Sequence, residues 1–314
     1  MKFAVLVSGA GGAAAISTIK ALRMGGFAGR IVATDADPLS AGLYLADAFR
    51  VVPKAEDPEF YPVVERLIAE EQIRVILPTS GFDIFEFARH KRELEALGAV
   101  VGMSDLDAML TCANKWEFYL KTNGAFPVPD TSRDLRSWRR FPCFVKPVFG
   151  KGSRDVHRCE SRAALEFYAS RSGDALVQEY LPGEEYTVDV LSDLSGAPRL
   201  AVPRVRLQTR DGVSYKGRVV RDAEMERLCL EIARHLQLKG PTCMQLRRDA
   251  EGRPQFIEVN PRIGGGSIFT ALAGVNIPML LLELISGIEL SPPAAREIVV
   301  LRYYEEIVLD VGRA

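Results

Sequence analysis

The fold is decided by the stretch Phe256-Ile257-Glu258-Val259-Asn260-Pro261-Arg262, whose pattern predicts a β-strand that ends at Pro261. Side chains two residues apart on a strand point to the same face, so Glu258 and Asn260 should lie side by side. A carboxylate oxygen and an amide oxygen are hard donors that suit Mg²⁺. Arg262 follows as a planar cation for a phosphate or carboxylate. A solvated strand end would explain the same pair, so its meaning depends on the residues upstream.

Upstream lie lysines and a glycine loop. Lys146 ends an apolar strand, and a lysine there needs a partner because an unpaired buried ammonium is costly. The small residues of the loop 150–153 free backbone amides to approach phosphate oxygens, although a hairpin turn with a solvated lysine is the alternative. Residues 176–189 follow the pattern of strand, turn and strand. They offer backbone groups for an adenine edge and Glu185 for a ribose hydroxyl.

The order of these motifs resembles the ATP-grasp superfamily, and the resemblance covers nearly the whole chain. Within it, the run from Asn260 to Ser267 resembles the stand-alone carboxylate–amine ligases of the carbamoyl-phosphate synthase large-chain group. Two departures stand out: Asp155 lies where a glycine is common, and residues 78–86 lack the usual paired acids. The motifs are Asn114-Lys115-Trp116, Phe144-Val145-Lys146-Pro147, Gly150-Lys151-Gly152-Ser153, residues 178–189, Gln245 and Glu258-Val259-Asn260-Pro261-Arg262.

The resemblance implies an ATP-grasp fold of the α/β and α+β classes, preceded by a Rossmann-like domain with a parallel sheet. We expect that N-terminal domain over residues 1–110. A small lid subdomain should span residues 111–182, and the subdomain with the metal site and the tail should span residues 183–314.

Individual elements follow from hydrophobic periodicity. The first third should alternate strands at 3–8, 30–35, 74–77 and 99–102 with helices at 13–24, 58–71 and 82–97, which is typical of a parallel sheet. Ser104 and Asp107 have the spacing of a capping box for the next helix. The last part should be an antiparallel sheet with a helix over residues 223–236. A β-rich tail should follow over residues 298–309.

Composition excludes several classes of protein. The chain has 47% apolar residues and a formal net charge of −1, which argues against nucleic-acid and membrane-surface partners. Five cysteines without a CxxC pair are typical of a cytosolic chain. The start is predicted as a strand rather than a signal peptide, and the longest apolar stretch, residues 268–285, is too interrupted to span a bilayer. We therefore expect a cytoplasmic protein, and a homodimer is compatible with the sequence.

A competing motif opens the chain. Residues 9–14 fit the dinucleotide fingerprint between a strand and a helix, and Asp35 lies at the distance of the ribose-binding acid. Taken alone, this motif predicts an NAD(P)-dependent oxidoreductase. That interpretation leaves Lys146, Glu185 and Glu258 without a role. The third alternative is an ATP-binding subunit without catalytic activity.

The favoured hypothesis, as the resemblance implies, is an ATP-dependent ligase. It would activate a small carboxylate as an acyl phosphate and join it to an amine, releasing ADP and phosphate. Arg262, Lys146 and Arg218 are the candidate catalytic residues. Mg²⁺, or alternatively Mn²⁺, would be held by Gln245, Glu258 and Asn260. The candidate ATP-binding residues are Lys115, Lys146, Lys151, Gly152, Ser153, Gln178, Glu179, Leu181 and Glu185.

Overall fold

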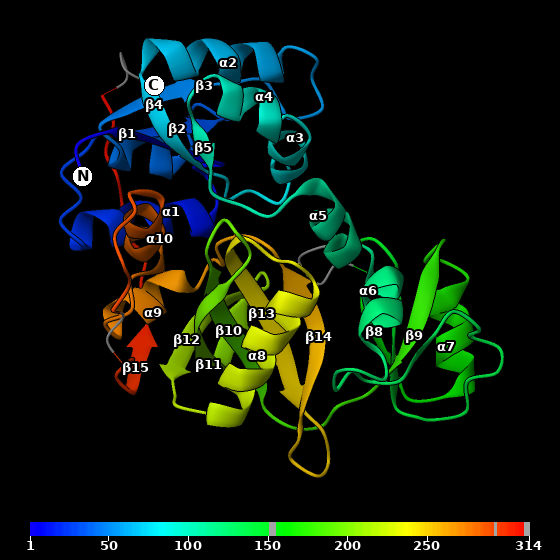
Figure 1. The fold of residues 1–314 in the computed structure, drawn as a ribbon. Helices are drawn as coiled ribbons and strands as arrows, with labels where there is room; N and C mark the ends of the chain where they lie inside the picture. Colours follow the sequence, from blue (N-terminus) through cyan, green and yellow to red (C-terminus); the bar gives the residue numbers. More distant parts are fainter. Residues whose placement is uncertain (151–154, 292–293, 311–314) are drawn as a thin grey trace.

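The computed structural model describes residues 1–150, 155–291 and 294–310 of the 314-residue chain. It contains a five-stranded sheet in the N-terminal third, a four-stranded sheet in the middle and a six-stranded sheet after them (Figure 1). The combination matches the predicted mixture of α/β and α+β architecture. Among the described residues, no helix is both long and apolar enough to cross a membrane.

The N-terminal sheet is parallel throughout, with the strand order β3-β2-β1-β4-β5. Alternate residues of its central strand serve two cores: Val5 and Val7 belong to one, and Ala4 and Leu6 to the other. Both faces are therefore covered, as a parallel sheet requires. The elements are β1 (Ala4–Ser8), α1 (Ala13–Met24), β2 (Ile31–Asp35), η1 (Ala41–Leu45), β3 (Ala48–Val51), α2 (Phe60–Glu70), β4 (Ile73–Leu77), α3 (Ile84–Arg89), α4 (Lys91–Ala96) and β5 (Val100–Val101).

The single helix predicted over residues 82–97 is wrong, because the chain breaks at His90 into α3 and α4. Lys91 is buried at the break. Its ammonium donates to the Met103 carbonyl and to the Asp105 carboxylate, both at 2.8 Å. These bonds satisfy a buried cation, and a tertiary contact thus overrides the local helical pattern.

The predicted capping box is also wrong. The N-cap of the next helix is Asp105, which makes no side-chain capping bond. Ser104 instead bonds to Lys239, accepting from its backbone N–H at 2.9 Å and donating to its carbonyl at 3.0 Å. The serine therefore ties the N-terminal third to the six-stranded sheet. The short edge strand β3 was not predicted either, since its residues show no clear alternation.

The middle of the chain forms the four-stranded sheet, in the order β6-β9-β7-β8, with antiparallel neighbours. Helix α7 packs on β7 and β8 around the buried side chains of Cys143, Val145 and Leu165. The elements here are α5 (Leu106–Ala113), α6 (Lys115–Thr122), β6 (Thr131–Ser132), β7 (Cys143–Pro147), β8 (His157–Cys159), α7 (Arg162–Ala169) and β9 (Ala175–Glu179).

The six-stranded sheet is antiparallel, with the order β14-β13-β10-β11-β12-β15. On β10, Tyr186, Val188 and Val190 pack with α8, so Thr187 and Asp189 face the other way. That other face carries the candidate site. The elements are β10 (Glu185–Ser192), β11 (Pro198–Arg210), β12 (Val213–Val219), α8 (Ala223–His235), β13 (Gly240–Arg248), β14 (Pro254–Asn260), α9 (Ser267–Leu272), α10 (Ile277–Ile285) and β15 (Ile298–Leu301).

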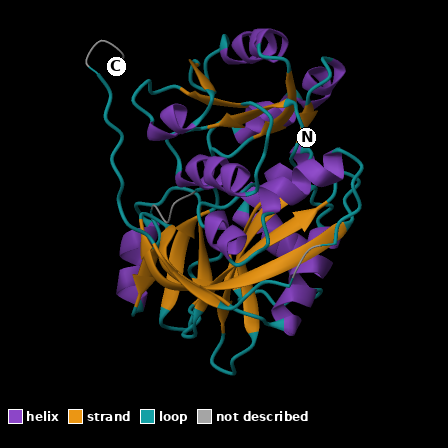
Figure 2. Ribbon diagram, turned by 90° about the vertical axis from the view of Figure 1, so that its left-hand side faces the viewer, coloured by secondary structure: helices purple, strands orange, loops and turns teal. Residues whose placement is uncertain are grey.

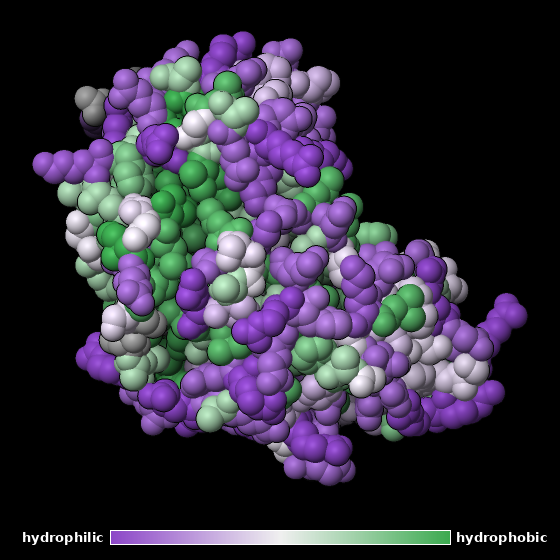
Figure 3. All heavy atoms as spheres, viewed as in Figure 1, coloured by the Kyte–Doolittle hydropathy of each residue, from purple (hydrophilic) through white to green (hydrophobic). Residues whose placement is uncertain are grey.

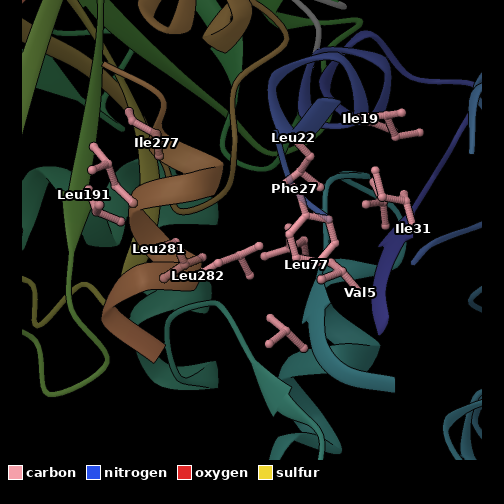
Figure 4. Close-up of a cluster of buried hydrophobic side chains, with 14 of the residues drawn as sticks. Val5, Ile19, Leu22, Phe27, Ile31, Leu77, Leu191, Ile277, Leu281 and Leu282 are labelled. Atoms are coloured by element: carbon pink, nitrogen blue, oxygen red, sulfur yellow. The ribbon is translucent and has the colours of Figure 1, made fainter. Parts of the chain in front are cut away.

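One hydrophobic core joins the N-terminal sheet to the end of the chain. Leu281 and Leu282 of α10 point toward Phe27 and Leu77 of the parallel-sheet unit (Figure 4). Apolar atoms also reach the surface around this junction (Figure 3). The last third of the chain therefore packs into the core of the first third. The expected domain boundaries near residues 110 and 182 stay predictions.

The tail contains less strand than predicted. Within residues 298–309, only Ile298–Leu301 is a strand, and it pairs with β12 at the sheet edge. After it, the described residues run without regular structure past the side of the N-terminal unit (Figure 2).

A buried ion pair joins strands β10 and β11 of the six-stranded sheet. The Arg204 guanidinium donates to Asp189 through Nε at 2.8 Å and through Nη2 at 2.9 Å, and both side chains are at most 3% exposed. Thr270 of α9 donates its hydroxyl to the same carboxylate. Burial disfavours the charged form of Arg204, but Asp189 reverses this effect and raises the pKa of the guanidinium above its ordinary value.

We expect Asp189→Asn to lower the free energy of unfolding by about 3 kcal/mol, because it leaves a buried guanidinium without a counter-charge. Asp174→Asn is the matched control. It breaks the pair of Asp174 with Arg133, whose side chains are 58% and 46% exposed, and should cost less than about 1 kcal/mol. Urea unfolding measures both. Equal losses in the two variants would contradict the structural importance of the buried pair.

Candidate functional site

Two cavities lie on the face of the six-stranded sheet that α8 leaves open. The first, of about 320 Å³, lies between this sheet and the four-stranded sheet, and we call it the lysine cavity. The second, of about 650 Å³, lies between the six-stranded sheet and the N-terminal unit, and we call it the arginine cavity. Gln245 lines both. The predicted site residues Lys115, Lys146, Gln178, Glu179, Leu181, Glu185, Gln245 and Glu258 line the lysine cavity.

Lys146 is the buried cation of the lysine cavity. It lies on β7 with 6% of its surface exposed and donates to the side-chain oxygen of Gln178 on the neighbouring strand. Burial lowers its pKa to about 8. The Glu258 carboxylate opposes this shift, and the positive charge of Lys115 adds to it. The expected partner of Lys146 is thus a neutral amide, which leaves the positive charge available to an anion.

The second lysine is positioned by a helix cap. Asn114 accepts hydrogen bonds from the backbone N–H groups of Trp116 and Glu117 and so begins α6 directly before Lys115. The Lys115 ammonium donates to the carbonyl of Gly150 at 2.9 Å, and burial lowers its pKa. The lysine therefore contacts the first residue of the glycine loop.

Strand register assembles the acidic side of the site. Gln245 on β13 lies opposite both Thr187 on β10 and Glu258 on β14. Asn260 follows Glu258 on the same face, and its amide donates to the Glu258 carboxylate at 2.7 Å. The side-by-side placement predicted for Glu258 and Asn260 is therefore present.

These donors suit a hard divalent cation. Glu258 supplies a carboxylate, and Gln245 and Asn260 supply amide oxygens. Within the described ranges, no group of three or more His, Cys, Asp or Glu side chains is placed to hold a metal. A cation bound here would take its remaining ligands from water and phosphate oxygens, as Mg²⁺ commonly does.

The remaining predicted residues lie in different places. Arg262 lines the arginine cavity together with Asn260 and donates to the Ile263 carbonyl at 3.1 Å. Arg218 is absent from the described linings of both cavities; its guanidinium lies 4.0 Å from the Glu184 carboxylate. Lys151, Gly152 and Ser153 lie outside the described residues.

Asp155, the first described residue after the glycine loop, adopts a φ of 55°. This left-handed conformation favours glycine, and aspartate is one of the residues that tolerates it best. The departure from glycine noted in the sequence therefore keeps the backbone geometry that a glycine would adopt.

Two arginines of the site were not predicted. Arg204 and Arg206 on β11 both line the arginine cavity, and Arg206 also forms a 2.7 Å ion pair with Glu185, which lines the lysine cavity. Their signal was present in the sequence, because the two arginines alternate with Val205 and Leu207 directly after the apolar run of residues 200–203.

The side chain of Asp35 bonds to the backbone of the opening glycine turn. Asp35 accepts from the Gly11 backbone N–H at 2.7 Å and from the Asp37 backbone N–H at 3.0 Å. The carboxylate therefore closes the turn and places negative charge where a dinucleotide would place its pyrophosphate. This geometry counts against the oxidoreductase alternative.

Two protein-family models match the chain. The model described as "ATP-grasp in the biosynthetic pathway with Ter operon" matches residues 171–307, and the model described as "PylC-like, N-terminal domain" matches residues 5–101. Residues 171–307 of this chain therefore match an ATP-grasp family. The predicted superfamily and fold class are thereby confirmed.

Relatives with curated names agree with this family. A D-alanine–D-alanine ligase of Thermotoga maritima is 31% identical over 126 residues, which are 37% of this chain and 41% of the relative. The match thus spans about two fifths of that ligase. A carbamoyl-phosphate synthase of Methanobrevibacter smithii is 23% identical over 305 residues, covering 90% of this chain and 80% of the relative.

Solved structures share the fold at low sequence identity. The biotin carboxylase domain of Hydrogenobacter thermophilus 2-oxoglutarate carboxylase, in complex with MgADP and bicarbonate, has a TM-score of 0.74 at 18% identity, covering 94% of this chain and 72% of that chain. An ADP complex of N5-carboxyaminoimidazole ribonucleotide synthetase has a TM-score of 0.74 at 15% identity, with coverage of 95% and 80%.

The lowered pKa of Lys146 gives a pH dependence of stability. Between pH 8 and the ordinary lysine value of about 10.4, only the unfolded chain binds this proton, so raising the pH favours the folded state. From pH 7.5 to 9.5, we expect the free energy of unfolding to rise by about 2 kcal/mol relative to Lys146→Met, which lacks the titrating group. Urea unfolding at both pH values measures the difference. Parallel pH curves would show that Lys146 titrates normally.

Proposed function

We propose that this protein is an ATP-dependent carboxylate–amine ligase that forms an acyl phosphate and releases ADP and phosphate. One observation carries the proposal: the lysine cavity and the arginine cavity meet at Gln245, with Glu258 on one side and Asn260 and Arg262 on the other. A nucleotide in the first cavity would therefore direct its terminal phosphate toward an acid in the second.

The lysine cavity supplies the groups that a nucleotide needs. Lys115 and Lys146 neutralise phosphate charge, and Gln178, Glu179 and Leu181 frame the adenine. Glu185 takes the ribose hydroxyls. Lys151, Gly152 and Ser153 are proposed as the part of the loop that covers the triphosphate. The ATP-grasp family and the ADP complexes of the structural neighbours support this assignment.

Catalysis follows from charge and position. A carboxylate oxygen would attack the γ-phosphorus of ATP, with ADP as the leaving group. Gln245, Glu258 and Asn260 would hold Mg²⁺, which would neutralise phosphate charge. Arg262 stabilises negative charge on the transferring group, and the cavity walls exclude the water that would hydrolyse an acyl phosphate. The amine then attacks the activated carbonyl and displaces phosphate. Arg218 has no part in this scheme, because it lies outside the described linings of both cavities.

Nucleotide choice is the first test. Mg-ATP should raise the apparent melting temperature, because a ligand that binds only the native state stabilises it, and NAD(H) should leave the temperature unchanged. Lys146→Met should lose most of the Mg-ATP shift while remaining folded, because it keeps the apolar stem and removes the charge. Thermal denaturation with each ligand measures this effect. A shift with NAD(H) and none with Mg-ATP would refute the ligase assignment.

The metal ligands give a second test. Glu258→Gln should require a roughly tenfold higher Mg²⁺ concentration for half-maximal stabilisation by ATP, because an amide coordinates the ion without neutralising it. Asn260→Asp keeps an oxygen ligand and adds a charge, so its Mg²⁺ midpoint should hold or fall while its ATP affinity drops. Mg²⁺ titrations at fixed ATP compare the two variants with the wild type. Superimposable curves would show that the pair is purely structural.

A further inference from the structure

The charges that line the arginine cavity are divided between its two walls. The acidic lining residues, Asp35, Glu56 and Asp83, all belong to the N-terminal unit. The arginines, Arg204, Arg206 and Arg262, all belong to the six-stranded sheet and the loop after it. The one lysine of the described lining, Lys54, is exposed and lies two residues from the exposed Glu56. The cavity therefore has an acidic wall and a cationic wall.

The cationic wall retains unused hydrogen-bond donors. Arg204 and Arg206 are each more than nine-tenths buried, and Nη1 of Arg204 and Nε of Arg206 have no hydrogen-bond partner. Both atoms are enclosed by protein, so the arginines favour an anion in this part of the cavity through their positive charge, which Asp189 and Glu185 offset in part. Asn260 and Gln245 line the same wall. The carboxylate that receives the phosphoryl group therefore belongs here.

The acidic wall suits a cation for a specific reason. The uncapped N-terminus of α1 would ordinarily attract an anion, but Asp35 already accepts from the Gly11 backbone N–H at that position. A carboxylate has about four lone-pair sites, and the two bonds to Gly11 and Asp37 leave capacity for another donor. An ammonium group would add donors and neutralise the charge, whereas a second anion would be repelled.

We propose that the acid activated by this protein is an amino acid, bound with its carboxylate against Arg204, Arg206 and Arg262 and its ammonium toward Asp35. Asp35 is then a specificity-determining residue, because it distinguishes an amino acid from the same acid without its amino group. The inference rests on the proposed ligase function and names the substrate class of that site.

The test compares matched acids. The full chain is incubated with Mg-ATP, hydroxylamine and one acid at a time, taken from the L- and D-amino acids and from the corresponding acids that lack the amino group. Hydroxamate and ADP are then measured. At least one amino acid should give product at ten or more times the rate of its des-amino partner. Equal or faster reaction of the des-amino acids, or no product from any amino acid, would overturn the proposal.

A pair of variants then tests Asp35 itself. With the best amino acid, Asp35→Asn should raise KM at least about tenfold and change kcat by less than about threefold, and the KM of the des-amino partner should not rise. Asp37→Asn is the matched control: it removes the same charge two residues away, from a side chain that also accepts a backbone N–H but does not line the described part of the cavity. Equal KM values in the two variants, or a fall in kcat alone, would show that Asp35 only supports the turn.

Failure of this inference differs from failure of the ligase assignment. If Mg-ATP stabilises the protein but the amino acids give no product, the ligase assignment stands and the amino-acid class is wrong. If Mg-ATP fails to stabilise the protein, both are wrong. Asp35→Asn should keep the full Mg-ATP shift, because Asp35 lies outside the described lining of the lysine cavity.

Discussion

The buried ion pair between Arg204 and Asp189 is the interaction on which the arrangement of the site depends. It joins two neighbouring strands, and Thr270 adds α9 to the same carboxylate. The loop before α9 lies directly over the guanidinium, where a Cβ at Gly266 would come within 2.5 Å of Arg204 Nη1. Only glycine permits this approach without movement. Asp189 thus fixes the Arg204 guanidinium by charge. The loop that carries Arg262 can pack directly on this guanidinium because Gly266 has no side chain.

The same loop contacts the N-terminal unit. Ser17 of α1 donates to the Gly265 carbonyl at 3.0 Å, and Asn276, the N-cap of α10, donates to the Ala21 carbonyl of α1 at 2.7 Å. Polar bonds from α1 therefore complete the apolar junction described above. Because the arginine cavity is enclosed by both units, the stability of this junction and the shape of the cavity are determined together.

Sequence patterns predicted those features of the site that depend on residues close together in the chain. Alternation on strands placed Glu258 and Asn260 together, and the strand position of Lys146 indicated a buried cation that needs a polar neighbour. What the sequence could not supply was contact between distant segments. Lys91, directly after the helix break at His90, donates to the Met103 carbonyl, and Ser104 bonds to Lys239 instead of capping its own helix. Arg204 and Arg206 had a local signal, their alternation with apolar residues, but that signal could not identify their partners Asp189 and Glu185.

The pair of Glu185 and Arg206 forms part of the wall between the two cavities. Arg206 lines the arginine cavity, Glu185 lines the lysine cavity, and their side chains form a 2.7 Å ion pair. This part of the wall therefore consists of one ion pair. Replacing Arg206 to change the shape of the arginine cavity would also leave Glu185 without its partner and disturb the lysine cavity. Residues 1–101 build the opposite wall of the arginine cavity. None of them is among the described residues that line the lysine cavity. The arginine cavity can therefore be reshaped from that wall while the lysine cavity is left intact.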